Sequence, residues 1–100
     1  MRKSYGLIEI SGVVAALDAL DIMCKAADVT LATWERKLGG RLVTIIVEGD
    51  VAAVTAAVEA AKARAIKRPV SSGVIANPHE VTVAQVKRSM KRFRSVEEMG

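Results

Sequence analysis

Two strand-like segments joined by a pair of glycines dominate the middle of this sequence. Along residues 29–34 the side chains alternate, with Val29, Leu31 and Thr33 on one side and Thr30, Ala32 and Trp34 on the other. Residues 42–47 are an almost unbroken β-branched run, and Gly39-Gly40 tolerates the positive φ that a hairpin connection needs. The pattern predicts a β-hairpin. By itself, its charged connection could be an ordinary turn with solvated side chains.

The hydrophobic residues of the chain are mostly small. Its 100 residues correspond to one domain with one core. Of these residues 51% are hydrophobic but only 3% are aromatic, and alanine is abundant. Buried apolar area stabilises a fold by about 25 cal/mol per Å², so a core of alanine and valine is marginal alone. The composition therefore suggests that contacts between subunits contribute to stability.

Cysteine usage and hydropathy restrict the compartment. The single cysteine excludes an intrachain disulfide and suits a reducing compartment. No apolar run reaches the ~18 residues of a membrane span. Residues 1–4 lead into a strand pattern and not into the apolar core of a signal peptide. We therefore expect a soluble, cytosolic protein with no membrane partner.

Positive charge is concentrated toward the C-terminal part of the chain. The formal net charge is +4, and nine of the fifteen basic residues are Lys62, Arg64, Lys67, Arg68, Lys87, Arg88, Lys91, Arg92 and Arg94. Clustered Lys and Arg attract phosphates, but proteins that bind single strands also need stacking aromatic side chains. Tyr5, Trp34 and Phe93 fall in three different elements. We therefore do not expect nucleic-acid binding.

A strand and then a helix are predicted for the N-terminal part of the chain. Residues 5–10 alternate as a strand, and Ser11 is placed to cap the helix that follows. The apolar positions of this helix form one stripe, consisting of Val13, Ala16, Leu17, Leu20, Cys24 and Ala27. On this pattern Cys24 is a core residue and not a nucleophile. Asp21 and Lys25 lie off the stripe and form a favourable pair one turn apart.

The next helix is expected to start after Gly49, with Asp50 as its N-cap. Its apolar repeat consists of Val51, Val54, Val58, Ala61 and Ala65. Alanines cover much of the remaining surface, so another backbone, from the fold or from a neighbouring subunit, can approach closely. Proline disfavours helical backbone in the residue before it, so Arg68-Pro69 predicts the helix end. Residues 70–76 predict a weak fourth strand.

A basic amphipathic helix is predicted at the C-terminal end. Residues 82–85 form a capping box, and the apolar stripe after it consists of Val83, Val86, Met90 and Phe93. Such a helix could touch a membrane or an acidic partner. We favour the alternative, a terminal helix packed by its stripe with its charges in solvent.

The resulting order is β-α-β-β-α-β followed by a helix. Two interleaved crossovers predict an α+β, ferredoxin-like fold, with a four-stranded antiparallel sheet and both helices on one face. We assign residues 4–80 to this domain and residues 81–100 to a basic C-terminal helix or tail. The architecture alone does not define a function.

No catalytic or metal-binding constellation is visible in the sequence. His79 is the only histidine, and no cysteine or carboxylate lies at ligand spacing from it. Ser11-Gly12 lacks the repeated glycines of a phosphate-binding loop. Asp18, Asp21 and Asp28 belong to a helix surface and do not converge. We therefore expect no enzyme activity, no metal and no cofactor.

Four stretches in the order found here resemble the shell proteins of bacterial microcompartments, in their single-domain, hexamer-forming class. The resemblance covers about residues 5–80. The stretches are Gly6-Leu7-Ile8-Glu9, the helix segments 15–19 and 23–29, the strand–glycine–acid–helix join at residues 42–54, and Asn77-Pro78-His79. The join at residues 42–54 carries the most weight.

The resemblance implies a structural role. Six copies would form a flat hexagonal tile, and tiles would join edge to edge with other shell proteins around a set of encapsulated enzymes. The hairpin would line a pore on the six-fold axis, through Lys37, Leu38, Gly39, Gly40 and Arg41. The residues implied at the edge where hexamers meet are Lys25, Asn77 and His79.

Some features depart from the family pattern. The segment between Trp34 and Leu42 is about one residue longer than the usual loop of the family and more charged. The loop register, and with it the residue at the narrowest point of the pore, is therefore fixed only to within one position. Asn77 replaces an arginine that helps to join neighbouring tiles in many members. The charges of Lys37 and Arg41 favour small anionic or polar metabolites in the pore. The competing interpretation is a small regulatory or ligand-binding oligomer of ferredoxin-like fold.

Overall fold

The computed structural model describes residues 3–36, 41–76 and 88. The elements in this part follow the predicted order: β1 (Ser4–Ser11), α1 (Val13–Ala26), β2 (Thr30–Arg36), β3 (Leu42–Gly49), α2 (Val51–Arg64) and β4 (Ser71–Ile75). The weak fourth strand predicted for residues 70–76 is therefore present as β4. Apart from position 88, the predicted C-terminal helix lies outside the described residues.

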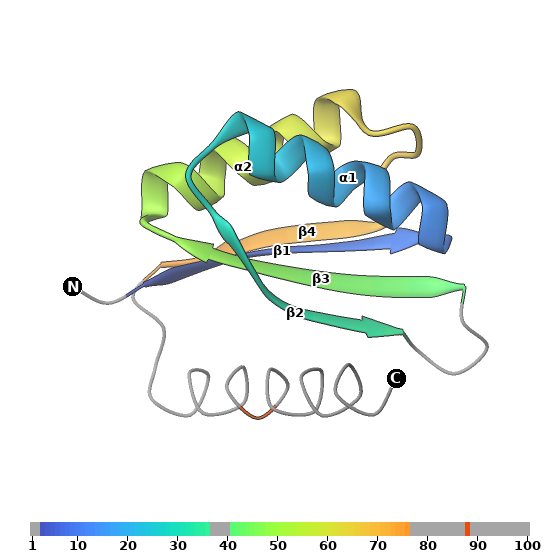
Figure 1. Ribbon diagram of the computed structural model, residues 1–100, viewed down its shortest axis with the longest axis horizontal. Coiled ribbons are helices and arrows are strands. Elements are labelled where there is room, and N and C mark those ends of the chain that lie inside the picture. Colours follow the sequence, from blue (N-terminus) through green and yellow to red (C-terminus); the bar gives the residue numbers. More distant parts are fainter. Residues whose placement is uncertain (1–2, 37–40, 77–87, 89–100) are drawn as a thin grey trace.

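The strands form one sheet in the order β2-β3-β1-β4, and every neighbouring pair is antiparallel. Both helices cover the same face of this sheet (Figure 1). This arrangement confirms the predicted ferredoxin-like α+β fold. It also leaves β2 and β4 as the two edge strands, while the most apolar strands, β1 and β3, lie in the centre.

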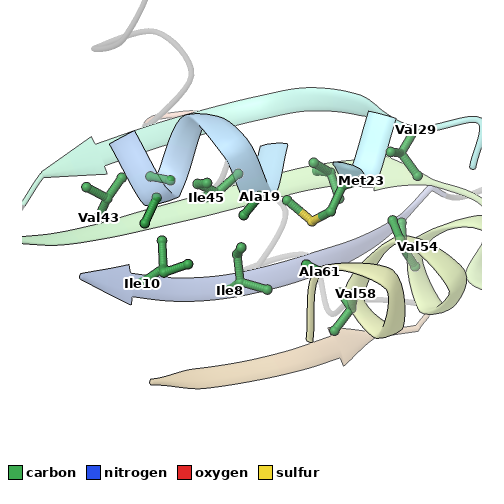
Figure 2. Close-up of a cluster of buried hydrophobic side chains, with 14 residues drawn as sticks. Ile8, Ile10, Ala19, Met23, Val29, Val43, Ile45, Val54, Val58 and Ala61 are labelled. Atoms are coloured by element: carbon green, nitrogen blue, oxygen red, sulfur yellow. The ribbon is translucent and has the colours of Figure 1, made fainter. Parts of the chain in front are cut away.

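The main core lies between the sheet and the two helices (Figure 2). The sheet contributes five fully buried side chains, Ile8, Ile10, Val43, Ile45 and Val47. The helices contribute mostly small residues, which are Ala15, Ala16, Ala19 and Met23 from α1 and Val54, Ala57, Val58 and Ala61 from α2. Small side chains allow the helix backbones to approach each other and the sheet closely.

Gly6 is the point of closest approach between β1 and α2. A Cβ atom at this position would lie 3.0 Å from Val58 Cγ2 and 3.2 Å from Val54 Cβ. Both atoms belong to the helix face that is packed on the sheet, so they have little room to move. Glycine at position 6 therefore lets α2 pack directly on the sheet.

The buried face of α1 differs from the predicted stripe. Leu17 is 55% exposed and Cys24 is exposed, whereas Ala19 and Met23 are buried. The prediction that Cys24 is a core residue is therefore wrong. Apolar residues occur on nearly every side of this helix, so the close approach to α2 and the sheet, which favours alanine, decides which side is buried.

The start of α1 also differs from the prediction. Ser11 remains in β1, paired with Leu42, and the N-cap position is Gly12, with no side-chain cap. Gly12 has φ 97° and ψ 137°, a backbone conformation that favours glycine. The chain therefore leaves the strand and enters the helix through a single residue, and Ser11 does not act as the cap.

In α2 the predicted start is confirmed and the predicted end is wrong. Asp50 is the N-cap, and its Oδ1 accepts a 2.7 Å hydrogen bond from the amide of Ala53. The helix ends at Arg64, before Arg68-Pro69, because the amide of Ile66 donates to a side chain of α1 and no longer to a helix carbonyl. At the first residue of α2, Val51 is 49% exposed, so it does not belong to the buried face of the helix, although the predicted apolar repeat included it.

A β-bulge in β2 changes the predicted alternation. Leu31 pairs with Val47 and Thr33 with Ile46, so Ala32 is the extra residue. Leu31 and Trp34 consequently both pack on the main core. Ala32 packs instead with Tyr5 and Ile46 on the opposite face. The alternation predicted for residues 29–34 is therefore correct as far as Ala32 and wrong for Thr33 and Trp34.

Candidate functional site

The hairpin of β2 and β3 is the first candidate site. β2 ends at Arg36 and β3 begins at Leu42. Of the five predicted pore residues, Lys37, Leu38, Gly39 and Gly40 lie outside the described residues. Arg41 is described and exposed, and its carbonyl accepts a 2.6 Å hydrogen bond from the amide of Gly12. The base of the hairpin is thus tied to the residue that starts α1.

The base of the hairpin is polar and charged. Arg36, Glu35 and Arg41 are exposed there. Glu35 lies opposite Thr44 in the sheet, and Arg36 lies opposite Val43. The base alone therefore carries a net positive charge. Within the described residues no group of three or more His, Cys, Asp or Glu side chains is arranged to hold a metal ion.

The connection between α2 and β4 lies at the same end of the molecule as the hairpin. The amide of Ile66 donates to Asp18 Oδ2 on α1 at 2.9 Å. The amide of Val70 donates to the carbonyl of Glu9, near the end of β1, at 2.7 Å. Both contacts fix this connection beside the end of β1. Ser11, the last residue of β1, pairs with Leu42, the first residue of β3. The connection therefore lies at the end of the sheet where the hairpin is.

Glu9 binds side chains of both neighbouring strands, which the sequence did not suggest. Its Oε1 accepts a 2.7 Å hydrogen bond from Ser71 Oγ, and its Oε2 accepts one of 3.3 Å from Thr44 Oγ1. One carboxylate thereby links β4 and β3 across β1 on the face away from the helices. The only signal in the sequence was an acidic residue within an otherwise apolar strand.

The second candidate site is the exposed side of α1 near its end. Lys25 Nζ and Asp21 Oδ2 form the predicted ion pair at 2.9 Å, with 75% and 61% of the side chains exposed. Partial burial raises the pKa of the neighbouring Cys24 thiol, and the charge of Asp21 adds to this effect. Cys24 is thus mostly a neutral thiol at pH 7. Asn77 and His79, the other predicted edge residues, lie outside the described residues.

Comparison with known proteins identifies the family. The BMC domain family matches residues 4–78, which is most of the chain. The chain belongs to the BMC domain family. This confirms the resemblance to bacterial microcompartment shell proteins that the sequence indicated.

Characterised BMC domain relatives are similar over most of the chain. Bacterial microcompartment shell protein PduA of Citrobacter freundii is 44% identical, over 78% of this chain and 85% of its own length. Carboxysome shell protein CcmK2 of Synechococcus elongatus is 46% identical, over 80% of this chain and 81% of its own length. Bacterial microcompartment shell protein EutK of Escherichia coli is 45% identical, over 82% of this chain but only 50% of its own length.

A solved BMC structure has the same fold. The crystal structure of a microcompartments protein from Desulfitobacterium hafniense matches with a TM-score of 0.76 and 27% identity. The match covers 89% of this chain and 49% of the other, so this chain spans about half the length of that protein. In the described part of the chain, no helix is long and apolar enough to cross a membrane.

Proposed function

We propose that this BMC domain protein is a structural subunit of a bacterial microcompartment shell in the cytoplasm. Six copies form a cyclic ring with the hairpin around a central channel, and rings join edge to edge into a sheet. Its partners are further copies, other shell proteins of the same microcompartment, and the enzymes that the shell encloses. The role is structural and not catalytic, as the names of the relatives suggest.

Exposed apolar side chains beside the hairpin are the observation that carries this proposal. Val14, Leu17, Ile66 and Val70 are 73%, 55%, 66% and 69% exposed. Asp18 joins α1 to Ile66, and Val14 lies one helical turn before Asp18. These side chains therefore gather at one end of the molecule, and exposed apolar groups of this kind favour burial against another protein.

A ring of copies would bury these side chains. In a cyclic assembly each copy presents one surface to its neighbour and receives a different surface from it, and the ring closes without leaving either surface free. The core of this subunit is built mainly from alanine and valine. Burial between subunits would add the apolar area that such a core lacks.

The channel is proposed to favour small anionic or polar metabolites. Lys37 and Arg41 would be present six times around the axis. Two unit charges ~8 Å apart in water interact by about 0.5 kcal/mol, which salt reduces to roughly 0.2 kcal/mol. Six such interactions, from one charged position in each copy, give about 1 kcal/mol, a several-fold preference for anions. Amides of Gly39 and Gly40 directed into the channel would add to this preference.

The edge between rings is proposed to include Lys25, together with Asn77 and His79. Lys25 supports this assignment because it is 75% exposed at the last turn of α1, where its ammonium group is available to a neighbouring ring. Its partner Asp21 is on the same copy, so the ammonium group keeps further donors for an acceptor across the edge.

The oligomeric state tests the proposal. Leu17→Glu places a charge in the proposed contact between subunits and should convert rings into smaller species in sedimentation velocity. Val51→Glu is the matched control, because Val51 is similarly exposed but lies at the opposite end of the molecule. A monomeric unsubstituted protein would overturn the proposal. A dimer or trimer with a bound metabolite would support the ligand-binding alternative instead.

A further inference from the structure

The connection between α2 and β4 carries positive charge that is not neutralised within the described residues. The segment from the last residue of α2 to the start of β4, residues 64–70, is here called the basic connection. Its three cations are exposed and form no ion pair within the described residues; they are Arg64, Lys67 and Arg68. The preceding Lys62 differs, because it pairs with Glu59 at 3.5 Å. Two carboxylates lie beside the connection: Asp18, which accepts from the amide of Ile66, and Glu9, which accepts from the hydroxyl of Ser71 at the start of β4. Each copy therefore presents three cations against two carboxylates, an excess of positive charge.

Backbone contacts fix the position of the basic connection. Its first part is bound by the amide of Ala65, which donates to Ala61 O at 3.1 Å, and by that of Ile66, which donates to Asp18 Oδ2 at 2.9 Å. Its end is bound by the amide of Val70, which donates to Glu9 O at 2.7 Å. Pro69 restricts the backbone between these anchors. The charges are therefore held at a defined place.

The basic connection lies near the base of the hairpin. Two backbone hydrogen bonds serve as anchors: Val70 binds Glu9, and Arg41 binds Gly12. Gly12 follows Glu9 by three residues. Three strand residues span ~10 Å, and β3 and β4 each lie ~5 Å to either side of β1, so the two anchors are on the order of 15 Å apart. Figure 1 shows the α2–β4 connection at the end of the sheet where β3 begins.

We propose that the six basic connections of the ring form a collar of positive charge around the channel entrance, where they concentrate small anionic metabolites. This inference rests on the proposed ring with the hairpin at its axis. Charged rims raise the local concentration of oppositely charged solutes and their rate of entry. Arg64, Lys67 and Arg68 thus select anions before the solute reaches Lys37 and Arg41.

A small anion fits this surface better than a macromolecule does. An extended nucleic acid would require stacking aromatic side chains, and none lies among residues 61–76. An acidic protein segment would require apolar contacts beside the charges. The apolar neighbours, Ile66 and Val70, are assigned to the contact between subunits.

Thiol modification at the hairpin measures the effect of the collar. The reporter chain carries Cys24→Ser, which removes the exposed native thiol, and Leu38→Cys in the predicted channel. Its modification rates are measured with an anionic sulfonatoethyl and a cationic trimethylammonioethyl methanethiosulfonate. Lys67→Glu should lower the anionic-to-cationic rate ratio severalfold at ~0.1 M salt and by a larger factor at ~10 mM, because the Debye length grows from about 10 Å to about 30 Å and screens the collar less. Arg68→Glu is a second variant with the same expectation.

The control is Lys3→Glu, which changes the same charge at the opposite end of β1, where Lys3 pairs with Glu48. Equal rate ratios in the Lys67→Glu and Lys3→Glu rings would overturn the collar while leaving the ring intact. A decrease that persists at ~1 M salt, where the Debye length is about 3 Å, would also overturn it. Binding of polyglutamate, a soluble acidic polypeptide, is measured for the same chains. If Lys67→Glu abolished this binding and left the anionic-to-cationic rate ratio unchanged, the collar would be overturned and the basic connection would be a protein-docking surface instead. Absence of rings in native mass spectrometry of the unsubstituted protein would overturn the proposed function itself.

Discussion

The amide of Gly12 donates a 2.6 Å hydrogen bond to the carbonyl of Arg41. This contact joins the residue between β1 and α1 to the last residue before β3, although 29 positions separate them in the sequence. It holds the base of the hairpin beside the start of α1. The proposed channel lining and the proposed subunit contact, which includes Val14 and Leu17, are thereby positioned by the same part of the backbone.

Gly12→Ala should destabilise the fold through backbone conformation alone. A Cβ at this position would meet no atom within 4 Å, but φ is +97°. Residues other than glycine adopt such backbone at a cost of about 1–3 kcal/mol, and we expect this decrease in the free energy of unfolding in urea. Gly73→Ala is the control, since that position is equally open and has no positive φ. Equal stability of the two variants at one protein concentration would contradict the expectation.

Stability should fall at alkaline pH because of Tyr5. Burial raises the pKa of the Tyr5 hydroxyl above 10.0, the charge of Glu48 raises it further, and Lys3 partly opposes this. The folded protein therefore keeps the proton longer than the unfolded chain. Above pH ~10 unfolding releases a proton, so the free energy of unfolding decreases as the pH rises. Below pH ~10 the Tyr5 hydroxyl is protonated in both the folded and the unfolded chain, so its stabilising contribution is fully present.

Tyr5→Phe tests this pH dependence. Both chains should carry Cys24→Ser, because the raised pKa of Cys24 would add a similar loss from pH ~9. Urea unfolding at several pH values between about 8 and 11 should show a smaller alkaline decrease for the Tyr5→Phe chain. Parallel curves for the two chains would exclude Tyr5 as the cause.

Lys25→Asp should separate ring formation from sheet formation. The substitution removes the ammonium group from the proposed edge and places a carboxylate one turn from Asp21, which costs the helix only a few tenths of a kcal/mol. We expect intact rings in sedimentation and no sheets in electron micrographs. Lys62→Asp is the matched control, because Lys62 also pairs with an acidic residue of its own helix. Unaltered sheets of the Lys25→Asp protein would contradict the assignment.

Lys37→Glu should change the solute preference of the channel. Six lysines become six carboxylates, which offset the six charges of Arg41, so the several-fold preference for anions should be lost. The measurement is the entry of an anionic and a neutral solute of similar size into assembled shells, followed with an enclosed reporter enzyme. Neutral solute entry serves as the internal control for channel width. The same anionic-to-neutral ratio in the unsubstituted and Lys37→Glu shells would defeat this part of the proposal.

Local chemistry made several features of the fold predictable from the sequence. Asp50 was recognised as an N-cap because its side chain can satisfy a free amide within its own helix turn. Asp21 and Lys25 were paired because four positions on a helix bring side chains together. The order of strands and helices, and hence the ferredoxin-like sheet, followed from such short-range patterns.

Tertiary contacts decided which sides of these elements are buried. In α1, Leu17 and Cys24 fit an apolar stripe but are exposed, because close packing against α2 and the sheet selects alanine. In β2, the bulge at Ala32 exists only through pairing with β3 and reverses the alternation after it.

The sequence by itself determined the elements, their order and the Asp50 cap of α2, because those depend on neighbours a few positions apart. Only the folded chain brought Arg41 to Gly12 and Ile66 to Asp18. Those contacts join residues tens of positions apart, and in both the donor is a backbone amide, so side-chain patterns do not reveal them. They place the basic connection and the exposed apolar residues beside the hairpin, where the proposed assembly needs them.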